Sequence, residues 1–206
     1  MDDVERTWAV DRTAGWLGVA FLVTLLGSEA VLSLPDETAS PATVAAFYDG
    51  HRTFIIVLQL VGMLSAALLG LFAWRLRVVD RRVPVAGLIL AVAALAPALI
   101  TLVIAVVADP AHPADADTYN RLEPRGDDVL FVGIVLFAGA ITLVRSPRWL
   151  RVVAAVVALT GLLRLALEVV GRPRGVLDAL APIAFLVLVA ALTWLSFRGH
   201  RRVISP

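Results

Sequence analysis

Charged residues interrupt segments of this chain that are otherwise apolar enough to cross a lipid bilayer. One arginine and four carboxylates stand within or at the rim of such segments: Glu29, Asp128, Arg164, Glu168 and Asp178. A charge at membrane depth costs free energy, and ionisable residues found there usually face a cavity or a partner. These five residues are therefore the first candidates for chemistry.

Glu29 lies well inside its apolar segment and has no ionisable partner there. A lone carboxyl group in apolar surroundings favours its neutral, protonated form. A general acid needs such a retained proton, so Glu29 is the leading candidate for an acid. The alternative is a neutral carboxyl group that only hydrogen-bonds a neighbouring helix.

The other charged residues have structural interpretations that compete with catalytic ones. Arg164 and Glu168 are four residues apart, so a helix would place them on one face, where they can pair. Pairing lowers the cost of burying both charges, and we predict a structural ion pair between them. Asp128 and Asp178 stand where apolar segments begin, and a carboxylate there can cap a helix and oppose its dipole.

Composition excludes several classes of protein. Hydrophobic residues make up 60% of the 206 residues, far above the share typical of soluble domains. The net charge of +1 gives no reason to expect a nucleic acid as partner, and the absence of cysteine excludes disulfides and thiolate metal sites. Because no His, Asp or Glu residues have metal-ligand spacing, we expect neither a metal nor a cofactor.

Hydropathy predicts an all-α integral membrane protein that forms a single domain over residues 1–206. A helix needs ~20 apolar residues to cross a hydrocarbon core. Runs of about that length predict an antiparallel bundle of about six transmembrane helices, at residues 14–33, 53–74, 84–108, 129–144, 149–171 and 176–197. Pro97 should kink the third of them.

Arginine placement orients this bundle. Twelve arginines lie in the N-terminal segment, the second and fourth connections and the C-terminal segment, against five in the other connections. The positive-inside rule therefore predicts that both termini are cytoplasmic, in the cell membrane.

This orientation places the candidate residues in one half of the bilayer. Glu29 and Arg164 both lie about 22 Å along spans that enter from the cytoplasm, at 1.5 Å per residue. The spans that begin outside bring further residues into the same half: Gln59, Asp128, Asp178 and the aromatic residues Phe54, Phe131 and Phe185. The sequence thus predicts a polar cavity that opens outward.

Two outer connections are long. Ser40 followed by Pro41 is typical of a helix N-terminus and predicts a short helix that ends near Gly50 and lies on the membrane surface as a lid. The acidic, proline-bearing connection over residues 109–128 is predicted to be a solvated loop.

The segment that runs from Ser40 to Arg52 resembles a group of uncharacterised actinobacterial six-helix membrane proteins. In its size, lack of cysteine and buried carboxylates, the chain is also similar to the small membrane-integrated terpene cyclases of bacterial meroterpenoid and indole-terpenoid pathways. That resemblance implies an intramembrane Glu or Asp that protonates an olefin or epoxide of a prenyl chain between aromatic walls. No motif aligns residue by residue, so the assignments here come from depth in the membrane.

Three functions follow, in order of preference. The first is a metal-independent terpene cyclase whose lipophilic, prenylated substrate enters from the lipid bilayer, supplied by an upstream prenyltransferase. Its candidate catalytic residues are Glu29, Glu168 and Asp178, and its candidate substrate-binding residues are Arg164, Gln59, Asp128, Phe54, Phe131 and Phe185. The second is a non-catalytic membrane subunit whose charges pair with a partner, and the third is a small transporter or channel.

Overall fold

All regular elements in the described part of the chain are helices. The computed structural model describes residues 12–29, 31–35 and 39–198, apart from the side chain of Glu29. The helices are α2 (Arg12–Glu29), α3 (Pro41–Arg75), the 3₁₀ turn η1 (Leu76–Val78), α4 (Arg82–Ala93), α5 (Leu95–Val107), α6 (Pro113–Asn120), α7 (Glu123–Leu143), α8 (Arg148–Val169) and α9 (Leu177–Arg198).

Five helical segments are long and apolar enough to cross a membrane: Pro41–Val78, Arg82–Val107, Pro113–Leu143, Arg148–Val169 and Leu177–Arg198. The segment Arg12–Ser28 of α2 is also apolar but shorter. The prediction of an all-helical chain with several helices able to cross a membrane is therefore confirmed. The last two predicted spans coincide closely with α8 and α9.

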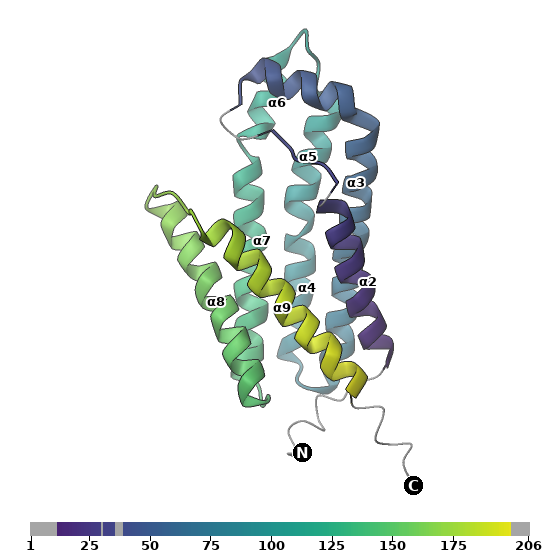
Figure 1. Cartoon of the computed structure of the whole chain (residues 1–206), viewed down its shortest axis with the longest axis vertical. Helices are drawn as coiled ribbons and strands as arrows, with labels where there is room; N and C mark the ends of the chain where they lie inside the picture. Colours follow the sequence, from purple (N-terminus) through teal and green to yellow (C-terminus); the bar gives the residue numbers. More distant parts are fainter. Residues whose placement is uncertain (1–11, 30, 36–38, 199–206) are drawn as a thin grey trace.

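The packing contacts between neighbouring helices form a closed ring, in which α9 crosses obliquely from α8 to α2 (Figure 1). α2 packs against α3, and α3 packs against α4 and α5. α4 and α5 pack against α7, and α7 packs against α8. α9 packs against both α8 and α2. Two glycines allow the closing contact, because a Cβ atom at Gly15 would lie 2.7 Å from the Phe197 ring and one at Gly18 would overlap Thr193. The beginning of α2 therefore lies beside the end of α9.

Apolar side chains fill the middle of the ring and also cover its outside. A large core cluster includes Phe72, Leu90 and Phe137, all fully buried. On the outer surface, Val152 and Leu159 of α8 are 63% and 67% exposed. A helix that is apolar on every face suits a lipid environment.

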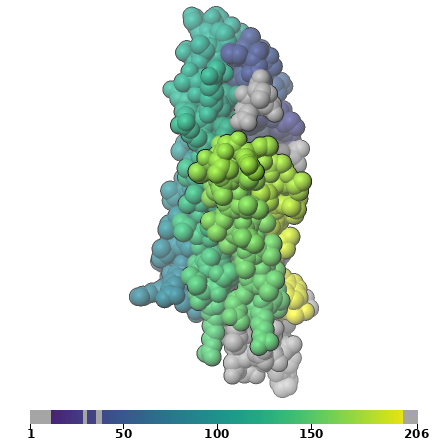
Figure 2. All heavy atoms as spheres, turned by 90° about the vertical axis from the view of Figure 1, so that its left-hand side faces the viewer, coloured from purple at the N-terminus to yellow at the C-terminus, as the bar shows by residue number. Residues whose placement is uncertain are grey.

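A second core lies at one end of the molecule, in a region that we call the cap: the first turns of α3, the end of α5, and α6. Figure 2 shows the cap, in teal and blue, rising beyond the yellow-green turn between α8 and α9. Val44 and Tyr48 of α3, Ile104 of α5 and Ala116 of α6 pack together there.

The predicted start of the helix at Ser40 is confirmed, but its predicted end is wrong. The Ser40 hydroxyl accepts a hydrogen bond from the Thr43 N–H at 3.2 Å, and a proline occupies the first turn. The helix then continues through Gly50 to Arg75. Tyr48 and Ile55, on either side of Gly50, lie in the same core, so packing keeps the helix continuous and there is no separate lid.

The connection over residues 109–128 is not a solvated loop, as the sequence suggested. It contains α6 and the first turns of α7, and Ala116 and Asn120 are buried. α7 begins at Glu123, before the predicted start of the fourth span at residue 129. Packing of Ala116 and Asn120 into the cap overrides the polar composition of the segment.

The prediction for Pro97 is confirmed, since α4 and α5 are separated at Ala94. Pro97 has no N–H to bond the carbonyl of Ala93, one turn earlier, and this missing bond accounts for the interruption.

Candidate functional site

Arg164 lies at the centre of a group of charged residues contributed by α7, α8 and α9. Its side chain is only 3% exposed. Nη1 donates to Oδ1 of Asp128 on α7 at 3.0 Å, and Nε donates to Oδ1 of Asp178 on α9 at 3.1 Å. One guanidinium group therefore joins three helices.

The ring of Phe131 supports this guanidinium group. Cζ of Arg164 lies 3.9 Å from the centroid of the ring. Phe131 stands three residues after Asp128, so one face of α7 supplies both the carboxylate and the ring. A cation over an aromatic face is stabilised further when it is withdrawn from water.

The turn between α8 and α9 adds a second arginine. Gly171 has a φ of +64°, and the N–H groups of Arg172 and Gly171 bond the carbonyls of Leu167 and Glu168, which is a Schellman termination of α8. The chain then reverses and brings Arg174 back onto Glu168, with a distance of 2.6 Å from Nη2 to Oε2.

Arg174 also lies 3.8 Å from Asp128 and 3.9 Å from Asp178. We call the five residues Asp128, Arg164, Glu168, Arg174 and Asp178 the Arg164 cluster. Burial by itself would lower the pKa of Arg174, but its bond to Glu168 and the nearby charges of Asp128 and Asp178 outweigh burial and raise that pKa. Arg174 therefore stays charged.

The predicted pair between Arg164 and Glu168 is wrong. Their spacing allows contact along α8, but Arg164 binds Asp128 and Asp178 across the helix interfaces, and Glu168 binds Arg174. The buried guanidinium group faces α7 and α9, whereas Glu168 is 41% exposed. Contacts between helices decide the pairing.

The prediction that Asp128 caps a helix is also wrong, because α7 begins at Glu123 and Asp128 lies in its second turn. Asp178 does lie in the first turn of α9, as predicted. Its carboxylate, however, accepts from the Arg164 guanidinium group. Both aspartates therefore connect helices.

Sequence reasoning missed Arg174 as a member of the cluster and treated it only as a basic residue of a connection. Two signals were available in the sequence. Arg174 stands four residues before Asp178, and Gly171 and Gly175 flank it in a way that allows a tight reversal. The cluster holds two arginines against three carboxylates, all of them bonded. An ionised carboxylate only accepts hydrogen bonds, so this cluster suits joining helices better than donating protons.

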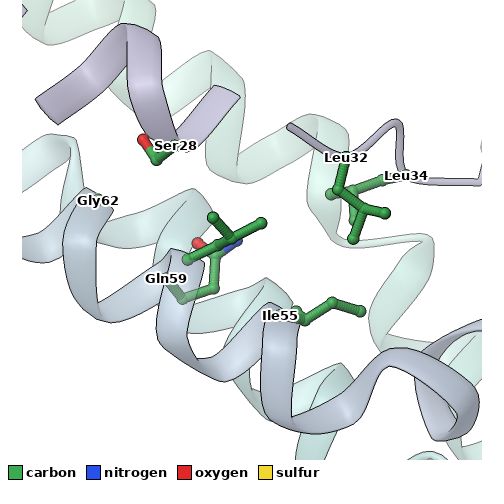
Figure 3. A pocket seen from close by; sticks show the side chains of 7 residues that line it. Ser28, Leu32, Leu34, Ile55, Gln59 and Gly62 are labelled. Carbon is green, nitrogen blue, oxygen red and sulfur yellow. The ribbon is translucent and has the colours of Figure 1, made fainter. Parts of the chain in front are cut away.

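A separate pocket lies between α2 and α3 (Figure 3). It has a volume of about 220 Å³ and is lined by Ser28, Leu32, Leu34, Ile55, Leu58, Gln59 and Gly62. We call it the α2–α3 pocket. It shares no residue with the Arg164 cluster.

Two polar side chains, Ser28 and Gln59, line this pocket together with leucine and isoleucine residues. The Ser28 hydroxyl donates to the carbonyl of Leu25 at 2.9 Å, so its hydrogen is already used. The side-chain amide of Gln59 has no hydrogen-bond partner among the residues that the structure describes. A Cβ atom at Gly62 would meet nothing within 4 Å, which keeps the pocket open on that side.

The remaining predicted site residues are dispersed. Phe131 and Phe185 are core residues, and Phe185 packs edge-on against Phe21 at 6.3 Å between ring centroids. Phe54 is 42% exposed and does not line the α2–α3 pocket. Glu29 is the last residue of α2, directly after Ser28, and its side chain lies outside the described part of the chain.

Within the described ranges, no group of three His, Asp or Glu side chains is arranged to hold a metal ion. The chain matches no protein-family model, and no characterised protein or solved structure is detectably similar to it.

Proposed function

We propose that the chain is a cell-membrane protein with six antiparallel spans, in which α2 is the first, and with both termini on the cytoplasmic side. The ring of helices supports this architecture, because α2 packs lengthwise between α3 and α9. The asymmetry of twelve arginines against five supports the orientation.

Reporter fusions test this arrangement. A reporter placed after Pro206 and one inserted between α5 and α6 should report opposite sides of the membrane. Two reporters on the same side would contradict both the six spans and the orientation.

For the function we propose acid-initiated cyclisation of a prenyl chain on a lipophilic acceptor, with the α2–α3 pocket as the site. The observation that carries the proposal is a pocket in which leucine and isoleucine side chains lie around the Gln59 amide, which has no hydrogen-bond partner among the described residues. Ser28, the residue before Glu29 on α2, lines the same pocket. Pockets for small molecules are typically apolar with a few polar groups that fix orientation.

In this proposal Glu29 is the acid, and the Arg164 cluster holds helices together. Glu168 and Asp178 accept hydrogen bonds from guanidinium groups and therefore suit the acid role poorly. The pocket of about 220 Å³ is smaller than the ~300–1,000 Å³ of sites that enclose a whole small molecule. It would take the reacting end of the prenyl chain, while the rest of the substrate stays in the bilayer.

Product formation from farnesylated and epoxidised substrates, assayed in membranes, tests the proposal. Glu29→Gln keeps the volume and removes the labile proton, so the rate should fall by ~10²–10⁴-fold while the protein still folds. Glu168→Gln is the matched control, and it should retain most of the activity.

If Glu29→Gln keeps its activity and Glu168→Gln loses it, Glu168 is the acid. If the wild-type protein forms no product from a broad panel of substrates, the non-catalytic membrane subunit becomes the better interpretation. The transporter interpretation has less support, because the charges of the Arg164 cluster are paired with one another.

A further inference from the structure

A second concave surface lies at the opposite end of α8 from the Arg164 cluster. A groove of about 420 Å³ between the end of α7 and the beginning of α8 is lined by Thr142, Arg148, Arg151, Val152 and Ala155. We call it the α7–α8 groove. It is separate from both regions described above.

The two arginines of the groove are uncompensated. Arg148 and Arg151 are exposed and stand three residues apart, so they lie on neighbouring positions of the α8 surface. Neither has an ion-pair or hydrogen-bond partner for its guanidinium group among the residues that the structure describes. The arginines of the Arg164 cluster, by contrast, are all paired with carboxylates.

The walls of the groove are apolar. Val152 and Ala155 contribute aliphatic surface, and Val152 is 63% exposed. The Thr142 hydroxyl donates to the carbonyl of Gly139 at 2.7 Å, so its hydrogen is not available to the phosphate of a ligand. The groove thus combines two free cationic groups with a wall that offers no competing polar contact.

Aromatic residues place the groove at the depth of the lipid headgroups. Trp149 packs edge-on against Trp194 at 6.1 Å between ring centroids, and Arg198 lies 3.6 Å over the Trp194 ring. Tryptophan concentrates at the interface between the hydrocarbon core and water. In a helix that crosses the membrane, Arg148 and Arg151 therefore reach the phosphate layer while Val152 and Ala155 face the acyl chains.

We propose that the α7–α8 groove is a binding site for an anionic phospholipid. The phosphate would accept hydrogen bonds from Arg148 and Arg151, and one acyl chain would lie along Thr142, Val152 and Ala155. Charge complementarity favours an anionic lipid over a zwitterionic one, because the groove has two positive charges and no carboxylate. This inference requires only that the chain lies in a bilayer and is independent of the proposed enzymatic activity.

Native mass spectrometry of the full chain, released from nanodiscs of equal phosphatidylglycerol and phosphatidylcholine content, measures which lipid stays bound. We expect phosphatidylglycerol to be retained preferentially. Arg148→Gln combined with Arg151→Gln should weaken its retention by about 30-fold, since each arginine near an anionic lipid surface contributes roughly a fivefold change in affinity.

The double variant Arg81→Gln with Arg82→Gln is the matched control. These two arginines are also exposed neighbours at a helix start, and they do not line the groove. The control should retain the lipid like the wild type. Equal losses in both double variants, or equal retention of the two lipids by the wild type, would overturn the proposal.

A further variant keeps the test decisive if the arginine double variant does not fold. Ala155→Phe fills the apolar part of the groove and leaves both arginines in place, so lipid retention should fall. Inorganic phosphate, added at increasing concentration, distinguishes a lipid site from a simple anion site. If phosphate displaces no lipid, the acyl chain contributes to binding; if phosphate binds as tightly as the lipid does, the lipid assignment is wrong.

Discussion

The Arg164 cluster and the α2–α3 pocket are two polar regions of one membrane-type bundle, and they differ in how far their polar groups are satisfied. In the cluster, each of the five charged side chains bonds to at least one other. In the pocket, the Gln59 amide has no partner in the described part of the chain. The region with more charge thus has less free hydrogen-bonding capacity.

This difference distinguishes charged groups whose burial is compensated by other residues from polar groups that remain able to bond a ligand. A charge at membrane depth signals that something must compensate it, and in the cluster the compensation comes from neighbouring helices. An unbonded polar group beside an empty volume can be compensated by a ligand. The predictions below test whether bonded groups stabilise the bundle and unbonded ones do not.

The largest expected effect is the loss of the Arg164 guanidinium group. Arg164→Leu removes the buried donor of two charge-assisted hydrogen bonds, to Asp128 and Asp178, and should lower the free energy of unfolding by ~3 kcal/mol, at about 1.5 kcal/mol for each bond. Unfolding in detergent, followed by circular dichroism, measures this change in the free energy of unfolding. Glu168→Gln is the control, because its half-exposed pair with Arg174 should contribute about 1 kcal/mol or less.

A double-mutant cycle sharpens this prediction. Arg164→Leu together with Asp128→Leu should recover part of the loss, because the partner carboxylate is removed as well. If the two single losses simply add, the bond at 3.0 Å does not account for the effect.

The next effect concerns the contact that closes the ring and so fixes α2, which lines the pocket. Gly18→Ala places a methyl group against Thr193 and should destabilise the protein by ~1–3 kcal/mol through overpacking. Gly27→Ala in the same helix meets nothing within 4 Å and should instead stabilise by about 0.5–1 kcal/mol. Thermal unfolding of both variants checks the contrast. Equal shifts would mean that α2 does not approach α9 closely.

A smaller effect is expected in the cap, where Tyr48 is fully buried and its hydroxyl has no hydrogen-bond partner among the described residues. Tyr48→Phe removes a polar group that no bond compensates, so stability should stay within about 0.5 kcal/mol of the wild type or rise. A loss of more than ~1 kcal/mol would reveal a partner for the hydroxyl, such as an ordered water.

The smallest effect lies at the surface, between α5 and α6. Nδ1–H of His112 donates a hydrogen bond to Oδ2 of Asp109 at 3.0 Å, and this bond raises the pKa of His112 and lowers the pKa of Asp109. The stabilisation linked to His112 is therefore complete below its unfolded value of 6.5 and is lost as pH rises through the folded pKa. NMR titration of the His112 ring checks the direction, and Asp109→Asn should bring the pKa back toward 6.5.

Much of the fold was predictable because it depends on local signals. Apolar length located α8 and α9, a serine followed by proline located the start of α3, and Pro97 located the interruption between α4 and α5. The extent of α3 and the helical form of residues 113–128 were not predictable, because packing between α3, α5 and α6 determines both.

The candidate site was predictable only in part, because the sequence placed Gln59, Phe54 and Phe185 beside the charged residues, whereas the structure places them elsewhere. Of the residues that depth in the membrane grouped, the structure brings Asp128, Arg164, Glu168 and Asp178 together. Spacing along one helix suggested the wrong partner for Arg164, since the partners of a buried side chain come from whichever helices face it. Arg174 was missed because only the reversal at Gly171 brings it back to the cluster.

Photocrosslinking with a diazirine-bearing farnesyl probe tests the central claim, that the α2–α3 pocket and not the Arg164 cluster meets the ligand. In membranes, peptide mapping should place crosslinks on α2 and α3, near Ser28 and Gln59, and Gly62→Leu should reduce them by filling the pocket. Crosslinks that map instead to α7, α8 and α9 around Arg164, and that persist in Gly62→Leu, would contradict the account.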